Sequence, residues 1–351
     1  MKIHILSGFL GSGKTTAIGQ AVRLLMEQGI QTGVITNDQG TKLVDGAFFK
    51  NLAIPSREVI NGCFCCNYND LDACITSLAQ KDKTEIIFAE AVGSCTDIVA
   101  TVLQPLLQFR PGASITMSVF ADARLLQMML QGRDSFDETV RYIYLKQLEE
   151  AGMIVVSKID LISGEELSAI KSLLRANYEN KKLVYQNSLN RDDIQHWISL
   201  LDAAISANAQ PSLNIDYATY ASGEAKMAWL DQSIALFSSS DRAMLQAEDL
   251  INTIYRKVKE QQYPIGHLKF LVNDSVKIGF TAGGEAGIIL PRIPAAKVSL
   301  LINMRVQTTP AALTDVVADA IKEAQRTTGC SIIVNSQSAF QPGYPSPVFR
   351  M

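Results

Sequence analysis

The chain lacks the features that would place it in a membrane, in the secretory pathway or on nucleic acid. It has no run of about 18 apolar residues, the length that a membrane helix needs, and no secretory signal sequence. Its formal net charge is only −3, whereas nucleic-acid binding normally requires an excess of basic side chains. We therefore expect a cytoplasmic protein whose partners include neither nucleic acid nor a membrane. The 351 residues, 47% of them hydrophobic, are enough for two domains with sizeable cores.

Histidine is scarce and dispersed, whereas cysteine is clustered. The three histidines, His4, His196 and His267, are far apart in the sequence, and His267 at the start of a strand fits a structural role. Three of the six cysteines fall within four residues. In a chain without an export signal the thiols are expected to stay reduced, so clustered thiols indicate metal or redox chemistry rather than disulfides. Repeats and low-complexity blocks are also missing from the sequence.

The first chemical motif is a glycine-rich loop between an apolar strand and an amphipathic helix. Residues 8–16 read Gly-Phe-Leu-Gly-Ser-Gly-Lys-Thr-Thr and fit the phosphate-loop pattern. Glycines let backbone N–H groups surround a phosphate, and the following helix N-terminus adds partial positive charge. We expect Lys14 to reach the β and γ phosphates and Thr15 to bind Mg²⁺. The predicted nucleotide contacts in this loop are Gly8, Gly11, Ser12, Gly13, Lys14, Thr15 and Thr16.

Two carboxylates follow later core strands. Asp38 comes after an apolar strand over 32–36, and Glu90 comes after one over 84–89. Open α/β sheets bind ligands at the carboxyl ends of their strands, so both acids are candidates for Mg²⁺ binding, and Asp38 could instead orient the attacking water. We therefore predict a catalytic set of Lys14, Asp38 and Glu90. An ordinary strand-ending turn is the alternative at Asp38.

Gly93 and Cys95 follow Glu90 closely. The backbone of Gly93 is expected to approach the γ-phosphate, because glycine permits a close approach. Cys95 then comes close in sequence to the phosphate sensor. We expect it to be a buried structural thiol, and completion of a metal site in the GTP-bound state is the alternative.

The cysteine cluster is the most unusual segment of the chain. Residues 61–67 read Asn-Gly-Cys-Phe-Cys-Cys-Asn, and this polar setting is typical of thiolates that bind a metal rather than of core packing. We predict that Cys63, Cys65 and Cys66 bind a soft or borderline ion such as Zn²⁺, Co²⁺ or Cu⁺. Three ligands leave a fourth position for water, another side chain or a partner protein. A redox cluster and simple packing remain alternatives, and Cys74 is expected to face inward from a helix.

A base-reading motif is predicted further along. A fifth strand over 153–156 is followed by Ser157-Lys158-Ile159-Asp160, which resembles the guanine-reading motif N-K-x-D. The Asp160 carboxylate can accept hydrogen bonds from the guanine ring N–H and exocyclic amine together, and Lys158 would lie along the base. Ser157 stands where asparagine is usual, which alters one supporting hydrogen bond. Ser188 is a candidate for the last base-contacting loop.

The chain is expected to form two domains. The first, over 1–206, is an α/β P-loop NTPase domain with a mostly parallel sheet and a last helix from Asp192 to Ser206. A polar linker is expected over 207–224. The second domain, over 225–351, shows a β-α-β-β-β-α-β order, which predicts a smaller α+β ferredoxin-like fold. The proline-rich segment over 340–347 is expected to run over the surface or into an interface.

Taken together, these motifs resemble the CobW/HypB/UreG family of metallochaperone GTPases. The resemblance depends on residues 8–16, on the C-x-C-C cluster at Cys63, Cys65 and Cys66, on the E-x-x-G segment from Glu90 to Gly93, and on 157–160. Their order and spacing agree with the family over nearly the whole chain. The family's first switch usually carries Asn-Glu, whereas this chain has Asn37-Asp38, and the family's histidine-rich stretches are missing.

The resemblance implies a slow GTPase with GTP and Mg²⁺ as cofactors and Zn²⁺ or Co²⁺ at the cysteines. The nucleotide state would gate the metal site, and the protein, as a monomer or homodimer, would deliver the ion to a client metalloprotein or corrinoid enzyme. The alternative is an activation or repair module for a cobalamin-dependent or other metalloenzyme, with the cysteines structural. A small-molecule kinase fits poorly, because it would need a separate acceptor pocket.

Overall fold

The computed structural model of the chain describes residues 1–40, 44–203, 211–284 and 287–351. The chain divides into two compact units that exchange segments: the first comprises 1–39, 52–223 and 344–351, and the second comprises 40–51 and 224–343. Part of the expected linker, 207–210, lies outside the described residues. Its last part is not irregular but forms helix α9, Tyr217–Ala225. No helix in the described ranges combines the length and the apolar character needed to cross a membrane.

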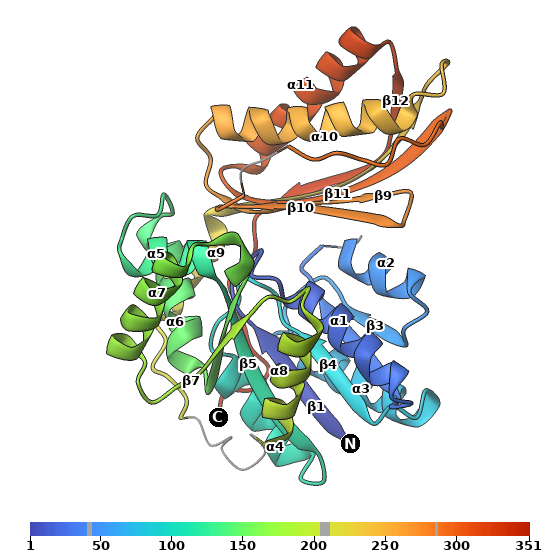
Figure 1. Ribbon diagram of the computed structural model, residues 1–351. Coiled ribbons are helices and arrows are strands. Elements are labelled where there is room, and N and C mark those ends of the chain that lie inside the picture. The colour runs from blue at the N-terminus through green and yellow to red at the C-terminus, as the bar shows by residue number, and fades with distance from the viewer. Residues whose placement is uncertain (41–43, 204–210, 285–286) are drawn as a thin grey trace. The chain divides into compact units, whose positions relative to one another are not determined.

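The first unit is built on a seven-stranded sheet in which every neighbouring pair is parallel. The order is β3-β2-β4-β1-β5-β6-β7. The strands are β1 (Lys2–Ser7), β2 (Thr32–Asn37), β3 (Ser56–Val59), β4 (Ile86–Glu90), β5 (Ser114–Asp122), β6 (Met153–Ser157) and β7 (Lys182–Gln186). The central strands are buried along their whole length, as parallel strands are when helices cover both faces of a sheet (Figure 1). The predicted α/β fold is confirmed.

Helices connect these strands. They are α1 (Lys14–Glu27), α3 (Tyr68–Lys81), α4 (Gln104–Phe109), α5 (Ala123–Leu130), α6 (Glu138–Glu150), α7 (Gly164–Asn177) and α8 (Arg191–Ala203). A π-helical turn, Val99–Leu103, precedes α4, and a 3-10 turn, Ile159–Leu161, follows β6. The last helix is described to Ala203, and its expected end at Ser206 lies outside the described residues. β1 lies between β4 and β5, so the strand order reverses at β1, which is where open α/β sheets form a ligand crevice.

The second unit is a five-stranded antiparallel sheet in the order β10-β9-β11-β8-β12. Its strands are β8 (Met227–Phe237), β9 (Ile265–Val272), β10 (Val276–Thr281), β11 (Lys297–Gln307) and β12 (Ser331–Phe340). Without the edge strand β10, the order is that of the split β-α-β fold, so the predicted ferredoxin-like arrangement is confirmed. Helices α10 (Ala243–Glu260) and α11 (Pro310–Thr328) cover one face of the sheet and form its apolar core (Figure 1).

The second unit also holds helix α2, Val44–Asn51, which comes from the N-terminal part of the chain. The Val44 N–H donates to Asn303 Oδ1 over 2.8 Å, and Asp45 forms ion pairs of 2.5 Å with both Lys269 and Lys277. The two ammonium groups hold the pKa of Asp45 well below its usual range despite burial of the carboxylate. Charge pairing therefore anchors α2, which follows the first switch motif, in the second unit.

Candidate nucleotide and metal site

The phosphate loop has the geometry that its glycines predict. Gly8 has φ +123°, and a Cβ at this position would lie only 2.1 Å from the carbonyl oxygen of Phe120 on β5. The Lys14 ammonium is buried within the loop and donates to the carbonyl oxygens of Gly8 at 2.6 Å and Phe9 at 3.2 Å. The Ser12 hydroxyl is buried and has no hydrogen-bond partner among the described residues. A cradle that buries one cation and one unpartnered hydroxyl fits a phosphate group.

The loop's other glycines and Thr16 complete this cradle. Gly11 and Gly13 also have positive φ angles, +73° and +89°, so their backbone conformation is one that side chains disfavour. Thr16 is exposed on the first turn of α1. Its side chain is therefore accessible at the helix N-terminus, where phosphate groups are favoured.

Two of the predicted Mg²⁺ ligands lie side by side. The Thr15 hydroxyl donates to Glu90 Oε1 over 3.0 Å, and both side chains are buried. Hydroxyl and carboxylate oxygens are the ligands that Mg²⁺ accepts beside a nucleotide, so this donor pair fits the ion. The Asp38 N–H donates to the carbonyl of Val59 over 3.2 Å, and its side chain is half-buried.

Gly93 lies against the phosphate loop. A Cβ at Gly93 would lie 2.9 Å from the backbone nitrogen of Leu10 and 3.0 Å from its Cα. Only glycine allows the E-x-x-G segment to approach the loop this closely. A movement of the phosphate-loop backbone at Leu10 would therefore displace Gly93 directly.

Ser157 joins the base-reading motif to the phosphate loop. Its hydroxyl lies 2.6 Å from the carbonyl oxygen of Ser12 and 3.2 Å from that of Ala121, so its single proton can serve either acceptor. The serine thus provides a hydrogen bond from this position despite its departure from the usual asparagine.

The other predicted base contacts lie around the ends of β6 and β7. Lys158 has φ +59°, and its ammonium pairs with Asp122 Oδ2 at 2.6 Å. Asp160 is exposed on the 3-10 turn. Ser188 is buried and accepts a hydrogen bond of 3.0 Å from Gln186. The ion pair between Lys158 and Asp122 was not predicted from the sequence.

Asn37 anchors the cysteine loop. Its amide nitrogen donates to the carbonyl oxygens of Val59 at 3.0 Å and Gly62 at 2.7 Å, and its Oδ1 accepts from the Phe64 N–H at 2.8 Å. Asn37 ends β2, whose neighbour in the sheet is β4. The end of a strand at the predicted nucleotide crevice therefore holds the C-x-C-C loop directly.

The three cysteine sulfurs converge. Cys63 Sγ lies 2.6 Å from Cys65 Sγ and 3.3 Å from Cys66 Sγ, and the Cys65–Cys66 separation is 3.8 Å. Zn–S bonds of about 2.3 Å in a tetrahedral site place sulfurs about 3.8 Å apart. One of the three separations already has that value, and the others are shorter. Three convergent thiols fit a thiophilic ion, and a modest opening of the Cys63–Cys65 pair would admit it.

The cluster polarises one thiol. Hydrogen bonds from the Cys65, Cys66 and Cys95 thiols lower the pKa of Cys63 well below its usual value. The same pairing with Cys63 raises the pKa of Cys66 to about 11. Cys63 is therefore the first sulfur of the cluster to become a thiolate, the form that binds metals.

Helix α6 fixes the segment that follows Gly93. Gln147, which is buried, donates to the carbonyl oxygens of Gly93 at 3.0 Å and Cys95 at 2.7 Å. The Glu150 carboxyl accepts from the Thr96 hydroxyl at 3.2 Å and from the Val99 N–H at 3.1 Å, and burial raises the pKa of this carboxyl to about 8. The sequence interpretation missed both residues, although polar side chains on the buried face of an apolar helix were the signal.

The C-terminal segment, residues 344–351, returns to the first unit. The Val348 N–H donates to the carbonyl oxygen of Cys65 at 2.9 Å, and the Ser346 N–H lies 3.3 Å from Cys66 Sγ. The Arg350 guanidinium pairs with Asp97 at 2.9 Å. The expectation for 340–347 named a surface or an interface, and residue 346 in fact reaches the thiol cluster.

Cys74 and His267 lie outside these sites. Cys74 is half-buried on α3, whereas we expected it to face inward. His267 is buried on β9 in the second unit.

The chain is similar to a known family and to several known proteins. Residues 2–185 match the family model described as CobW/HypB/UreG, nucleotide-binding domain. The chain is 27% identical over 193 residues to the zinc chaperone YeiR of Escherichia coli, covering 52% of this chain and 54% of that protein. It is 25% identical over 222 residues to zinc-regulated GTPase metalloprotein activator 1 of Dictyostelium discoideum, covering 54% and 46%. The match thus spans about half the length of these curated relatives.

A solved structure gives a weaker likeness. HypB from Helicobacter pylori in complex with nickel is 14% identical, with a TM-score of 0.45, over 61% of this chain and 91% of that one. The residues matched by the family model, in contrast, are more than half of the 351 and include the phosphate loop, the cysteine cluster and the E-x-x-G segment of this chain. The chain therefore belongs to the CobW/HypB/UreG family.

Proposed function

We propose that this protein is a GTP-hydrolysing metallochaperone that binds Zn²⁺ or Co²⁺ at Cys63, Cys65 and Cys66 and passes the ion to a client metalloprotein. Two relatives are named for zinc or for metalloprotein activation, which supports zinc as the first ion to test. A corrinoid enzyme is one class of client. The first unit, which carries the phosphate loop and the cysteines, would hold both ligands.

One observation carries this proposal: Asn37 makes two hydrogen bonds to the loop that bears the cysteines, at Gly62 and Phe64, and a third to Val59 just before it. Because Asn37 directly precedes Asp38, any rearrangement of this strand end around a γ-phosphate would move the cysteine loop. The nucleotide and the ion would then influence each other through one short element rather than over a long path.

The residues divide into three roles. Lys14 and the surrounding glycines bind phosphates, Thr15 and Glu90 hold Mg²⁺, and Asp38 orients water or adds a second carboxylate. Mg²⁺ supplies neutralisation of the charge on the phosphate oxygens. Asp160, Lys158 and Ser188 select guanine.

Metal titration with and without nucleotide tests the gating. We expect Zn²⁺ and Co²⁺ to bind about 5- to 150-fold more tightly in the presence of Mg²⁺ and a non-hydrolysable GTP analogue, the usual range of coupling between two sites. By linkage, zinc must tighten binding of the analogue by the same factor. Calorimetry of both titrations measures the two factors independently. Equal metal affinities with and without the analogue would show that the nucleotide does not control metal binding.

A second function is favoured by the burial of the cluster. Cys63 is 4% and Cys65 2% exposed, which is also typical of a structural metal site in an enzyme activator. In that case the ion would remain bound through nucleotide turnover. Metal content measured before and after a round of GTP hydrolysis separates the two functions, because a chaperone loses the ion to an added acceptor and an activator keeps it.

A further inference from the structure

Cys95 is part of the thiol cluster. Its side chain is fully buried, and it hydrogen-bonds to the thiols of Cys63 and Cys65. The four sulfurs come from two separate segments of the first unit: three from the C-x-C-C loop and one from the segment after Gly93. The sulfurs that all lie within 4.8 Å of one another are those of Cys63, Cys65 and Cys66. Cys95 contacts two of these thiols and would complete a four-sulfur site by closing on the third.

Zinc and tetrahedral cobalt take four ligands, and the C-x-C-C loop supplies three. We propose, on the basis of the proposed function, that the Cys95 thiolate is the fourth ligand, so that the ion is held by four sulfurs in a site closed to water. A closed, all-sulfur site selects thiophilic ions and disfavours Mg²⁺ or Ca²⁺, which prefer oxygen.

The position of Cys95 would couple the nucleotide to the metal ion through one short segment. Two residues before it, Gly93 lies against the backbone of Leu10 in the phosphate loop. Gln147 fixes the carbonyl groups of both Gly93 and Cys95, so this short segment is braced at both residues by one side chain. A shift of the segment upon γ-phosphate loss would withdraw one of four ligands and open the position through which the ion leaves.

The sulfur count of the bound ion tests this inference. The full chain is loaded with Zn²⁺ in the presence of Mg²⁺ and a GTP analogue, and X-ray absorption at the zinc edge gives the ligand set. We expect four sulfurs in the native protein and three in Cys95→Ser. With Co²⁺ alone as the probe, Cys95→Ser should also lose intensity in the sulfur-to-cobalt charge-transfer band and bind at least about 10-fold more weakly.

Cys74→Ser is the matched control, since it removes a half-buried thiol of the same unit outside the cluster, and it should behave like the native protein. Three sulfurs plus a lighter atom in the native protein would overturn the inference, and this measurement needs no variant. A native protein that binds neither ion would instead overturn the proposed function. Thermal unfolding of Cys95→Ser and Cys95→Ala without metal shows whether either substitution disturbs the fold.

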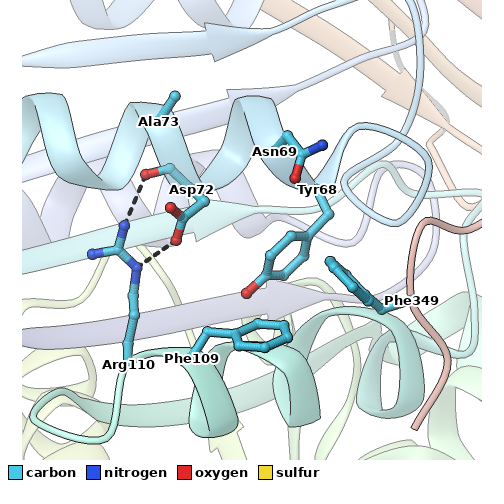
Figure 2. Close-up of a pocket in the computed structure, with 7 residues that line it drawn as sticks. All are labelled: Tyr68, Asn69, Asp72, Ala73, Phe109, Arg110 and Phe349. Carbon is cyan, nitrogen blue, oxygen red and sulfur yellow. Dashed lines mark hydrogen bonds and ion pairs between the residues drawn. The ribbon is translucent and has the colours of Figure 1, made fainter.

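A separate observation concerns residues 344–351, which we call the strap. The strap hydrogen-bonds to both cysteine-bearing segments: at Cys65 and Cys66 as described, and beyond Cys95 through Arg350–Asp97 and a 2.9 Å bond from the Met351 N–H to the carbonyl oxygen of Ala100. Figure 2 shows the Phe349 ring turned toward Tyr68 of α3 and Phe109 of α4. The ring centroids are 5.1 Å from Tyr68 and 5.2 Å from Phe109.

We infer that the strap covers Cys66, the outermost thiol, and limits transfer of the ion to an acceptor. The contacts that hold the strap are local: Arg350 is half-exposed whereas its partner Asp97 is buried, and each aromatic contact contributes about 0.5–1.5 kcal/mol. A segment that belongs to no strand or helix of the first unit can open locally without unfolding the sheet.

Release of zinc to a small chelator tests the strap. The double variant Phe349→Ala/Arg350→Ala, loaded with zinc, should lose the ion to 4-(2-pyridylazo)resorcinol several-fold faster than the native protein, and circular dichroism shows that the fold is kept. Tyr344→Ala is the control, because its side chain lies in the same segment and is 64% exposed. An unchanged release rate in the double variant, or an equal acceleration in the control, would contradict the inference.

Discussion

Replacing Lys14 by alanine is expected to abolish GTP hydrolysis while the protein remains folded. The ammonium group is buried in the phosphate loop and donates to two backbone carbonyls, so it is held where the β and γ phosphates would lie. Loss of one preorganised donor of this kind costs at least about 100-fold in rate. Phosphate release under saturating GTP and Mg²⁺ measures the effect, and circular dichroism reports on the fold.

Lys181→Ala is the matched control for this experiment. Lys181 also donates to a backbone carbonyl, that of Glu149 at 2.7 Å, but it precedes β7 far from the loop in sequence. The control should therefore lose a similar hydrogen bond and keep native turnover. Retained hydrolysis in Lys14→Ala would mean that residues 8–16 do not bind the triphosphate.

Replacing Cys65 by serine is expected to remove most of the metal affinity. The Cys65 sulfur lies 2.6 Å from that of Cys63 and 3.8 Å from that of Cys66, and a serine hydroxyl is a poor ligand for a thiophilic ion. Burying the hydroxyl costs roughly 1–3 kcal/mol of folding free energy. Elemental analysis after loading with zinc measures the bound ion, and thermal unfolding without metal measures the stability.

The two readouts also separate the proposed functions. In a chaperone, the variant loses zinc, and its apo form is destabilised relative to the apo native protein only by the buried hydroxyl. In an activator with a structural ion, the zinc-loaded native protein should be far more stable than the variant, because the ion's binding free energy becomes folding free energy. Cys330→Ser is the control, since Cys330 is similarly buried but lies in the second unit. Native zinc content in Cys65→Ser would exclude this thiol from the site.

Most of the parallel sheet was predictable because its strands are short apolar runs followed by polar residues. Strand β3, Ser56–Val59, has no such run and was not predicted. The phosphate loop, Glu90 and the C-x-C-C cluster were predictable for a different reason: their chemistry is confined to a few consecutive residues. Asn37 was visible in the sequence only as part of the motif with Asp38. Its role in anchoring the cysteine loop depends on Gly62 and Phe64, which are more than 20 residues away, and such a contact carries no local signal.

Sequence alone determined the family and the fold class of both units and predicted the residues of the candidate site, because periodicity and short motifs depend only on neighbouring residues in the chain. Only the tertiary structure decided which segments meet. It assigned residues 40–51 to the second unit and 344–351 to the first. It brought the Cys95 thiol to those of Cys63 and Cys65 and placed Gln147 behind Gly93. These contacts join residues separated by about 30 to 280 positions, and they form because packing and hydrogen bonding are satisfied in three dimensions, whatever the distance along the chain.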